Sequence, residues 1–315
     1  MPADKLTIES FLQKASEFPV LDVRSPSEYT HAHIPGAHSF PLFSDDERRR
    51  VGTAYHQEGR APAIKIGFDL FGPKMKDFVE KADALGSRTF LVHCWRGGMR
   101  SGAIAWLLDF YGFRVYTLAD GYKAFRRWVL TQFETPVQLR VLGGYTGSGK
   151  TRRLRESGEP FLDLENLAGH KGSAFGGIGL PPQPRQEMFE NLLAMELARL
   201  SSTGPIWVED ESRRIGSIHI PEALYTQMHL AALHVLEVPF EKRLDNILEE
   251  YGSAPGEALE MSIRKIEKRL GGLECKTALT ALHEGRIRDC FSILLVYYDK
   301  YYQKAMKERP VKQYT

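Results

Sequence analysis

The sequence predicts an α/β protein of two domains, and three observations support this prediction. The chain has 315 residues, about twice the length of a typical domain. Short apolar segments alternate with helical patterns in both halves, which is typical of parallel sheets covered by helices on both faces. Thr135-Pro136 interrupts the pattern, because proline cannot continue a helix. We therefore expect domains of residues 1–135 and 136–315.

The first domain contains three short apolar segments that read as strands, at residues 18–23, 88–93 and 113–118. Helical patterns lie between and after them, at residues 74–85, 100–111 and 121–133. Ile104, Leu107 and Leu108 fall on one side of the second of these helices. The order of strands and helices predicts a parallel sheet.

The second domain repeats this alternation and then becomes helical. Strands are predicted at residues 137–142, 205–208 and 231–238, and the first is followed by a Gly-rich turn and a helix. From Phe240 onward, apolar residues recur at spacings of three and four. The Gly- and Pro-rich stretch 169–184 predicts a long loop, and loops of that length are usually functional or mobile.

Composition and charge exclude several classes of protein. Hydrophobic residues make up 43% and charged residues 26%, as in folded soluble proteins. The N-terminus lacks a signal core, no apolar stretch could span a bilayer, and three cysteines are too few for a disulfide framework. We expect a cytoplasmic protein with no membrane partner, and we favour a monomer. Because the net charge is only +2, nucleic acid would have to bind a local basic patch.

Cys94 lies in the segment HCWRGGMRS, between a predicted strand and a predicted helix. Paired glycines let the backbone curl so that several N–H groups point inward. The positive end of the following helix and two arginines favour a thiolate at neutral pH. The loop therefore predicts a nucleophilic cysteine in a cradle that can also bind an oxyanion such as phosphate. The cradle residues are Arg96, Gly97, Gly98, Arg100 and Ser101.

The alternative is a cysteine buried for packing, but the glycines and arginines beside Cys94 have no packing reason. Cys275 and Cys290 lie in helical patterns without such neighbours, so for them burial is the better interpretation.

The spacing Cys-x5-Arg-Ser also describes tyrosine-phosphatase-type loops, and the preceding sequence discriminates. Residues 21–29 (LDVRSPSEY) and 33–37 (HIPGA) resemble the opening of a rhodanese domain. The resemblance covers about residues 5–130 and implies a rhodanese-like parallel-sheet domain. It also implies that the loop cysteine carries sulfur or selenium. The loop is one residue longer than many sulfur-transfer loops, which suggests a wider pocket for a larger oxyanion.

Residues 144–151, GYTGSGKT, fit the phosphate-loop pattern G-x-x-x-x-G-K-[ST]. A predicted strand precedes them and a predicted helix follows, which is the context that this motif requires. The glycines let N–H groups approach phosphate oxygens, Lys150 adds a charge and Thr151 can bind Mg²⁺. The second domain is thus predicted to be P-loop NTPase-like with a helical extension. The expected diphosphate-binding residues are Gly144, Thr146, Gly147, Ser148, Gly149, Lys150 and Thr151.

Two polar segments are further candidates. Glu209, Asp210 and Glu211 follow a buried strand, where a second metal-binding motif would lie, although acidic turns are often only solvated. Residues 163–176 are predicted to be a loop that holds Asp163 and Glu165 and the candidate substrate residues. Those candidates are His170, Lys171 and Ser173, and a polar loop without function is an equal interpretation.

Basic residues cluster on two predicted helices, and such runs are usually solvated faces. Clustered charge in one domain can also bind a nucleic-acid backbone. Our first choice for such a surface is Arg264, Lys265, Lys268 and Arg269, and our second is Lys300, Lys304, Lys307 and Arg309.

Together these motifs resemble the bacterial tRNA 2-selenouridine synthase family through nearly the whole chain. LENLAGHKGSAFG and VEDESRRIGSIHIP are the specific segments, since neither generic rhodaneses nor generic kinases carry them. The resemblance implies a transferase that acts on wobble 2-thiouridine in tRNAs for Lys, Glu and Gln. It implies S-geranylation with geranyl diphosphate and then replacement of the S-geranyl group by selenium from selenophosphate. It also implies a selenophosphate supplier as partner. No tightly bound cofactor is expected, and Mg²⁺ at Thr151 is the metal candidate.

The residues suit this chemistry. Alkylation turns a thiocarbonyl sulfur into a leaving group, and a phosphate loop stabilises a departing diphosphate. The thiolate of Cys94 suits selenium delivery from selenophosphate. Three other classes stay open. One is an ATP-dependent kinase or ATPase with a regulatory rhodanese module. A cysteine phosphatase is disfavoured by residues 22–37, and a non-enzymatic RNA-binding protein leaves Cys94 unexplained.

Overall fold

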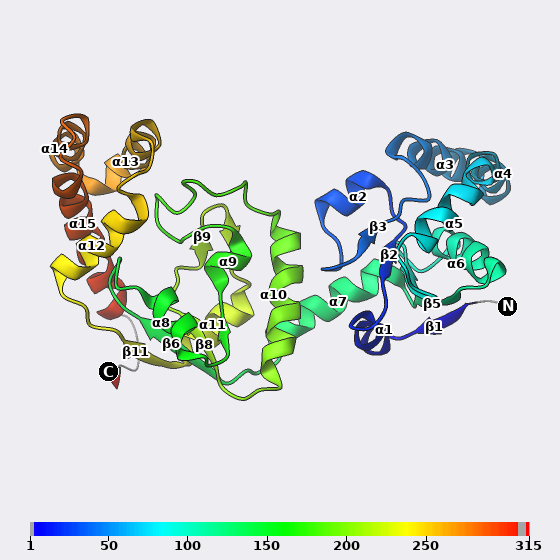
Figure 1. Ribbon diagram of the computed structural model, residues 1–315, viewed down its shortest axis with the longest axis horizontal. Helices are drawn as coiled ribbons and strands as arrows, with labels where there is room; N and C mark the ends of the chain where they lie inside the picture. The colour runs from blue at the N-terminus through cyan, green and yellow to red at the C-terminus, as the bar shows by residue number, and fades with distance from the viewer. Residues whose placement is uncertain (1–2, 308–312, 315) are drawn as a thin grey trace. The chain divides into compact units, whose positions relative to one another are not determined.

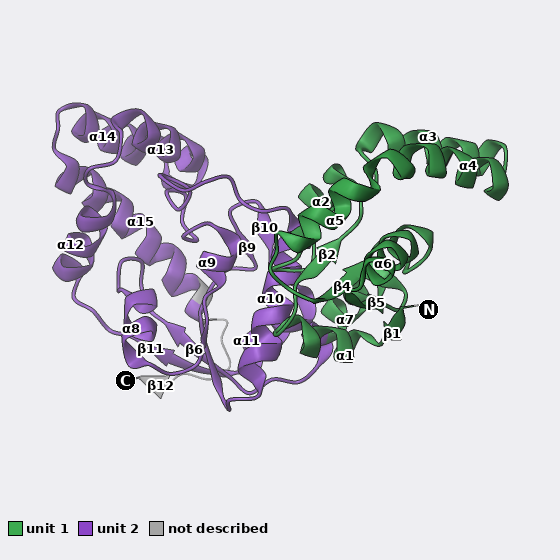
Figure 2. Ribbon diagram, turned by 45° about the vertical axis from the view of Figure 1, so that its right-hand side comes forward, with its two compact units in different colours: residues 1–131 green, residues 132–315 purple. Residues whose placement is uncertain are grey.

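The computed structural model describes residues 3–307 and 313–314, and these form two compact units (Figure 2). The first unit ends at Thr131 and the second begins at Gln132. This division falls inside helix α7 (Gly121–Glu134), whereas the sequence placed the boundary just after this helix. Each unit is an α/β fold built on a five-stranded parallel sheet, which confirms the predicted fold class.

The sheet of the first unit has the strand order β1-β5-β4-β2-β3. The three predicted strands correspond to β2 (Val20–Asp22), β4 (Thr89–His93) and β5 (Arg114–Leu118). The edge strands β1 (Asp4–Leu6) and β3 (His38–Ser39) were not predicted, because they are short and mostly exposed and therefore lack an apolar pattern.

Helices cover both faces of this sheet (Figure 1), and buried apolar residues of several of them form a core with the strands. They are α1 (Ile8–Ala15), α2 (Pro26–His31), α3 (Asp45–Gln57), α4 (Arg60–Phe71), α5 (Met75–Asp83) and α6 (Met99–Tyr111), with the 3-10 helix η1 (Gly72–Lys74) and the start of α7. Helix α6 ends at Gly112, whose φ of 110° is a backbone conformation that favours glycine. The buried side of α6 includes Ile104, Leu107 and Leu108, as its sequence pattern predicted.

The sheet of the second unit has the order β12-β11-β6-β8-β7. Its middle strands are β11 (Ala232–Val235), β6 (Leu139–Gly143) and β8 (Ile206–Glu209), which correspond to the three predicted strands. The edge strands are β7 (Phe161–Leu162) and β12 (Gln313–Tyr314), and β9 (Arg214–Ile215) pairs separately with β10 (Ile218–His219). Leu142 of β6 is paired with Glu209 of β8, so the segments that follow these two strands leave the sheet side by side.

The helices of the second unit fall into two groups along the chain. The first group lies between strands of the sheet along the chain and contains α8 (Lys150–Ser157), α9 (Leu164–Ala168), α10 (Gln186–Ser201) and α11 (Glu222–Leu230). The helical extension, yellow to red in Figure 1, contains α12 (Phe240–Tyr251), α13 (Gly256–Leu270), α14 (Gly272–His283) and α15 (Ile287–Lys307). These four helices bury a core of their own, into which Phe175 inserts from the preceding loop.

The prediction of a loop over residues 163–176 is wrong at its start, because residues 164–168 form helix α9. The Asp163 side chain accepts a hydrogen bond from the Asn166 amide at 3.0 Å and caps this helix. Gly169 ends it with a left-handed backbone, and no helix or strand follows until α10. Within the described residues, no helix combines the length and the apolar character needed to cross a membrane.

Candidate functional site

Cys94 occupies the turn between β4 and α6, and its side chain is buried. Its Sγ lies 3.2 Å from the Ser101 hydroxyl oxygen. Burial alone would raise the pKa of Cys94. The hydroxyl and amide of Ser101, the charge of Arg100 and the amide of Gly98 outweigh burial and hold the pKa below its ordinary value. Burial instead raises the pKa of Cys275 and raises that of Cys290 to about 11, so Cys94 is the one of the three cysteines whose surroundings favour the thiolate.

The two arginines of the cradle differ in whether another side chain holds them in place. Arg100 is held by Glu28, whose Oε2 accepts from Nη1 at 2.6 Å. Arg96 is exposed. Because the side chain of Glu28 orients Arg100 beside the thiolate, Glu28 belongs to the site, although the sequence indicated it only as part of a family motif.

The first residues of α7 hold the thiol loop in place through backbone hydrogen bonds. The amides of Tyr122 and Lys123 donate to the carbonyls of Cys94 and Trp95, at 2.8 and 3.1 Å. Gly97 has a φ of 62°, and a Cβ there would lie 2.6 Å from the Leu118 carbonyl oxygen. A Cβ on Gly121 would lie 2.2 Å from the Cys94 carbonyl oxygen. The loop therefore requires glycine at 97 and also at 121, whereas a Cβ at Gly98 would meet open space.

The Asp22-Val23-Arg24 motif supports the domain from inside. Asp22 and Arg24 are fully buried and form an ion pair of 2.6 Å. Arg24 also donates to the Ala32 carbonyl at 2.8 Å, and its guanidinium lies 3.8 Å from the centre of the Tyr122 ring. Because these groups are inaccessible, the motif supports the segments around the thiol loop from inside the domain.

The second chemical centre is the phosphate loop, which follows the buried strand β6 and opens α8. The Lys150 Nζ donates to the Gly144 carbonyl at 3.1 Å, so the ammonium group lies against the loop. Gly147 and Gly149 have φ values of 79° and 77°. A cavity of about 300 Å³ lies over this loop. It is lined by all the predicted diphosphate-binding residues, Gly144, Thr146, Gly147, Ser148, Gly149, Lys150 and Thr151.

The helical extension braces this loop, which no motif predicted. Arg243 of α12 is buried, donates to the Thr146 carbonyl at 3.1 Å, and forms two hydrogen bonds of 2.7 and 2.8 Å with Asp299 of α15. The Asn246 side chain donates to the Gly147 carbonyl at 2.8 Å. The two contacts with the loop join residues 97 and 99 positions apart, so sequence spacing gave no signal of them.

Three carboxylates face the phosphate loop. Glu165 of α9, Glu209 of β8 and Glu211 each offer an oxygen within 4.8 Å of the others. Burial and the neighbouring carboxylates raise the pKa of Glu165 to about 9 and that of Glu211 to about 7. Asp210 also lines the phosphate-loop cavity but is not part of this group, and its Oδ2 accepts from the Tyr302 hydroxyl at 3.3 Å. Glu209 and Glu211, two of the three predicted carboxylates, therefore lie close together. Glu165, which was expected to lie in a loop, is the third member of the group.

This carboxylate group fits a divalent cation with oxygen ligands. In residues 3–307 and 313–314, it is the only group of three or more potential metal ligands. The Glu209 Oε1 is buried without a hydrogen-bond partner among these residues, and the Thr151 hydroxyl bonds to the same carboxylate. A hard cation such as Mg²⁺ would satisfy this oxygen and neutralise the crowded charge. The candidate ligands are Glu165, Glu209, Glu211 and Thr151.

The candidate substrate loop divides between two cavities. Lys171 and Ser173 line the phosphate-loop cavity, and the Lys171 Nζ lies 2.6 Å from Oε1 of Glu250. His170 lies instead on a neighbouring cavity, where burial and the charge of Lys265 lower its pKa. The three residues are therefore close in space but serve two different surfaces.

The predicted basic cluster on α13 shares one exposed face of that helix. All four side chains of this cluster are exposed: Arg264, Lys265, Lys268 and Arg269. The opposite side of α13 is buried. Arg264 is paired with Glu260 at 2.7 Å, which leaves the other three as the more available charges. In the second cluster, Lys300 and Lys304 are exposed on α15. The side chain of Lys307 and the whole of Arg309 lie outside the part of the chain that the structure describes.

Comparisons with known proteins find relatives of both units. A family model described as the tRNA 2-selenouridine synthase AAA domain matches residues 137–314, and a rhodanese-like domain model matches residues 7–127. A tRNA 2-selenouridine synthase of Hydrogenovibrio crunogenus is 36% identical over 93% of this chain and 91% of its own length. That of Sulfurovum sp. is 37% identical over 82% of this chain and 77% of its own. That of Nitrosomonas europaea is 36% identical over 75% of this chain and 64% of its own.

Proposed function

The chain belongs to the tRNA 2-selenouridine synthase family, and we propose that it converts wobble 2-thiouridine in tRNA to 2-selenouridine through an S-geranyl intermediate. One observation carries this proposal. A single chain holds both a buried cysteine with a lowered pKa, in a loop of glycines and arginines, and a phosphate loop with an adjoining cavity. The two centres suit two successive group transfers on the same nucleoside. The substrates are tRNAs for Lys, Glu and Gln, whose wobble base must be exposed to reach an active site.

The first transfer belongs to the phosphate-loop unit. The thiocarbonyl sulfur attacks C1 of geranyl diphosphate, so a C–S bond forms and the C1–O bond breaks. Pyrophosphate leaves with the electron pair, and the N3 proton of the base is lost to pyrophosphate or solvent. Lys150 and the loop amides stabilise the charge that develops on the leaving oxygen. Mg²⁺ on Thr151 and the carboxylates would add Lewis-acid stabilisation of the same charge.

The second transfer belongs to the thiol loop and is redox-neutral. The Cys94 thiolate attacks phosphorus of selenophosphate, so an S–P bond forms and selenide leaves with the electrons of the Se–P bond. Selenide adds to C2 of the base, geranyl thiolate leaves, and N3 regains its proton. Water then hydrolyses the phosphocysteine to thiol and phosphate. Transfer of selenium onto sulfur would instead leave phosphorus reduced and would require a thiol to release the selenium.

The cradle supports each part of this step. Arg100, fixed by Glu28, lies where it can bind the phosphoryl oxygens, and Arg96 adds an exposed charge at the entrance. The Ser101 hydroxyl, 3.2 Å from Sγ, stabilises the thiolate before attack and again when water displaces it. Geranyl diphosphate and selenophosphate are co-substrates, and an enzyme that makes selenophosphate is the expected partner.

Pyrophosphate release tests this proposal. Geranyl diphosphate should yield pyrophosphate only with tRNA that carries 2-thiouridine, and tRNA without the thiocarbonyl is the matched control. An ATP-dependent kinase or ATPase would instead release phosphate from ATP without any tRNA. That result, together with no pyrophosphate from geranyl diphosphate, would overturn the proposal.

A further inference from the structure

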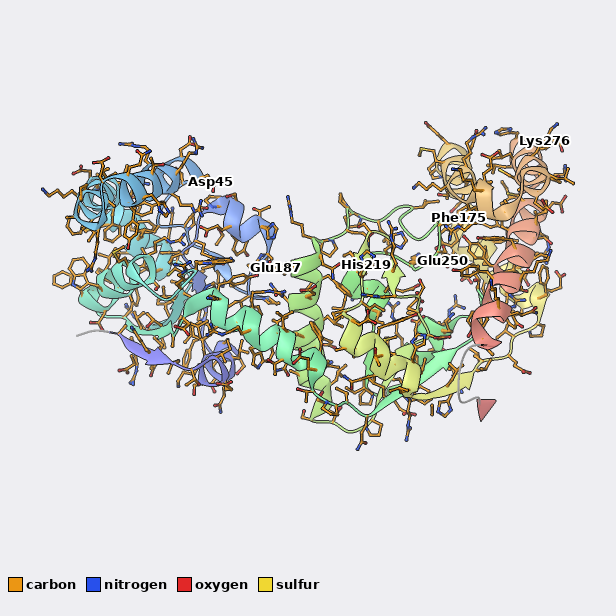
Figure 3. The ribbon with its side chains drawn as sticks, turned by 180° about the vertical axis from the view of Figure 1, so that it is seen from behind. Asp45, Phe175, Glu187, His219, Glu250 and Lys276 are labelled. Carbon is orange, nitrogen blue, oxygen red and sulfur yellow. The ribbon has the colours of Figure 1, made fainter. Side chains whose placement is uncertain are left out.

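A second cavity lies beside the phosphate-loop cavity and has no role in the proposed steps. Its volume is about 570 Å³. The loop at residues 170–179, the end of α12 and the first half of α13 form its walls. Glu250 and Tyr251 line both cavities, so the two spaces share a wall. Figure 3 labels Glu250 on α12 and Phe175 in the loop whose residues line both cavities.

Most of the lining of this second cavity is apolar. The apolar side chains come from the loop and from α13 and the segment before it: Ala174, Ile178, Ala254, Pro255, Ala258 and Met261. The side chain of Met261 is 54% exposed and lies at the wall of this cavity. His170 also lines the cavity, and its lowered pKa keeps it uncharged at neutral pH. Lys265 and Glu250 also line the cavity, so it offers apolar side chains to a flexible hydrocarbon and charged groups beside them.

The walls are held in place before any ligand binds. Phe175 is buried in the core of the helical extension, with its ring 6.1 Å from that of Tyr251 and 5.7 Å from that of Phe291. The Ala174 amide donates to the Tyr298 hydroxyl at 3.3 Å. Lys171, four residues before Phe175, faces the phosphate loop and pairs with Glu250. The same anchored loop thus presents a cation to one cavity and apolar groups to the other.

We infer that the second cavity holds the hydrocarbon chain of the allylic diphosphate and that Ala258 and Met261 set the chain length accepted. This inference rests on the proposed function, because it takes the diphosphate to lie on the phosphate loop. A chain that leaves that loop along the wall of Tyr251 and Glu250 enters the apolar space. At roughly 30 Å³ per heavy atom, the volume of one packed water, ten carbons need about 300 Å³, which this cavity provides.

Chain-length selectivity tests the inference. The kcat/KM of the full protein is measured with dimethylallyl, geranyl and farnesyl diphosphates and a tRNA that carries 2-thiouridine. Ala258→Phe fills the cavity, so the ratio of geranyl to dimethylallyl transfer should fall at least about tenfold. Ala198→Phe on α10, partly exposed and outside both cavities, is the matched control and should leave the ratio unchanged. Met261→Ala removes an exposed side chain that folding does not require, and it should lower the same ratio several-fold.

The outcomes separate the inference from the proposed function. If the native protein transfers none of the three chains, the proposed function fails and the inference fails with it. If the native protein transfers the geranyl group but both variants, Met261→Ala and Ala258→Phe, keep the native selectivity, only the inference fails. An equal loss for all three diphosphates, with a raised KM for tRNA, would assign the cavity to the nucleoside and would also overturn the inference.

Discussion

Lys150→Ala should slow geranyl transfer far more than it weakens tRNA binding. The Lys150 ammonium lies 3.1 Å from the Gly144 carbonyl, inside the cavity that we assign to the diphosphate. Its charge also lowers the pKa of Glu209 and Glu211, so its loss would leave these carboxyls more strongly protonated and less able to bind a cation. Both effects reduce stabilisation of the leaving diphosphate.

The size of the effect can be judged from the attraction between the Lys150 charge and the charge of a diphosphate in this cavity. Two unit charges 4 Å apart interact by about 4 kcal/mol at an effective dielectric constant of about 20. The loop amides remain in the variant and retain part of the stabilisation. Loss of a single preorganised donor commonly costs about 2.7–4 kcal/mol, or roughly a hundredfold to a thousandfold in rate. We expect a loss of that order in kcat for geranylation.

The assay is single-turnover formation of S-geranyl-2-thiouridine, followed by mass spectrometry of nucleosides. Lys276→Ala, at an exposed lysine of α14 outside both cavities and outside the candidate tRNA surfaces, is the matched control and should keep the native rate. Selenation of tRNA that already carries the S-geranyl group should be nearly normal in Lys150→Ala. If both steps fell equally, Lys150 would be serving tRNA binding or folding, and the assignment of the leaving group to this loop would be refuted.

Three further predictions follow from the other groups. Cys94→Ala should abolish selenation and spare geranylation, so S-geranyl-2-thiouridine accumulates; selenation at the native rate would remove Cys94 from the mechanism. Glu165 and Glu211 hold protons in the folded protein, with pKa values of about 9 and about 7 against 4.5 for an ordinary glutamate. With a chelator present, the stability of the folded protein should therefore fall as pH rises from about 4.5 through 9. Thermal melting would show this loss, and either Mg²⁺ or the Glu165→Gln substitution should reduce it. A melting temperature that does not change with pH would contradict the raised pKa values. Lys268→Glu with Arg269→Glu should weaken tRNA binding and make its salt dependence shallower by somewhat under ~2 units, while unchanged titrations would move the tRNA surface to Lys300 and Lys304.

The sequence predicted the parts of the fold that repeat a local pattern. The buried strands β4, β5, β6 and β8 are short apolar runs, and both loops that follow β4 and β6 carry paired or spaced glycines. Edge strands such as β3 and β7 have two residues each, which is too short for any periodicity to be visible. Helix α9 was missed because five residues after an aspartate cap resemble a polar loop.

The sites were predicted only as far as contiguous motifs reach. Cys94, Lys150 and Thr151 each lie in such a motif. Glu165 joins Glu209 and Glu211 across 44 residues of chain, and Arg243 reaches the phosphate loop from the helical extension. These partners become visible only when the chain folds back on itself, since neither has a neighbour in sequence that marks its role. Glu28 lies in the rhodanese motif of residues 21–29, but its ion pair with Arg100 of a different helix appears only in the folded chain.

The central claim is that one chain performs two ordered transfers through an S-geranyl intermediate, and omission of each co-substrate tests it most directly. Nucleosides from tRNA bearing 2-thiouridine are analysed by mass spectrometry after incubation with the native protein. Geranyl diphosphate alone should give S-geranyl-2-thiouridine, selenophosphate alone should give no new nucleoside, and both together should give 2-selenouridine. Formation of 2-selenouridine from selenophosphate alone would contradict the account.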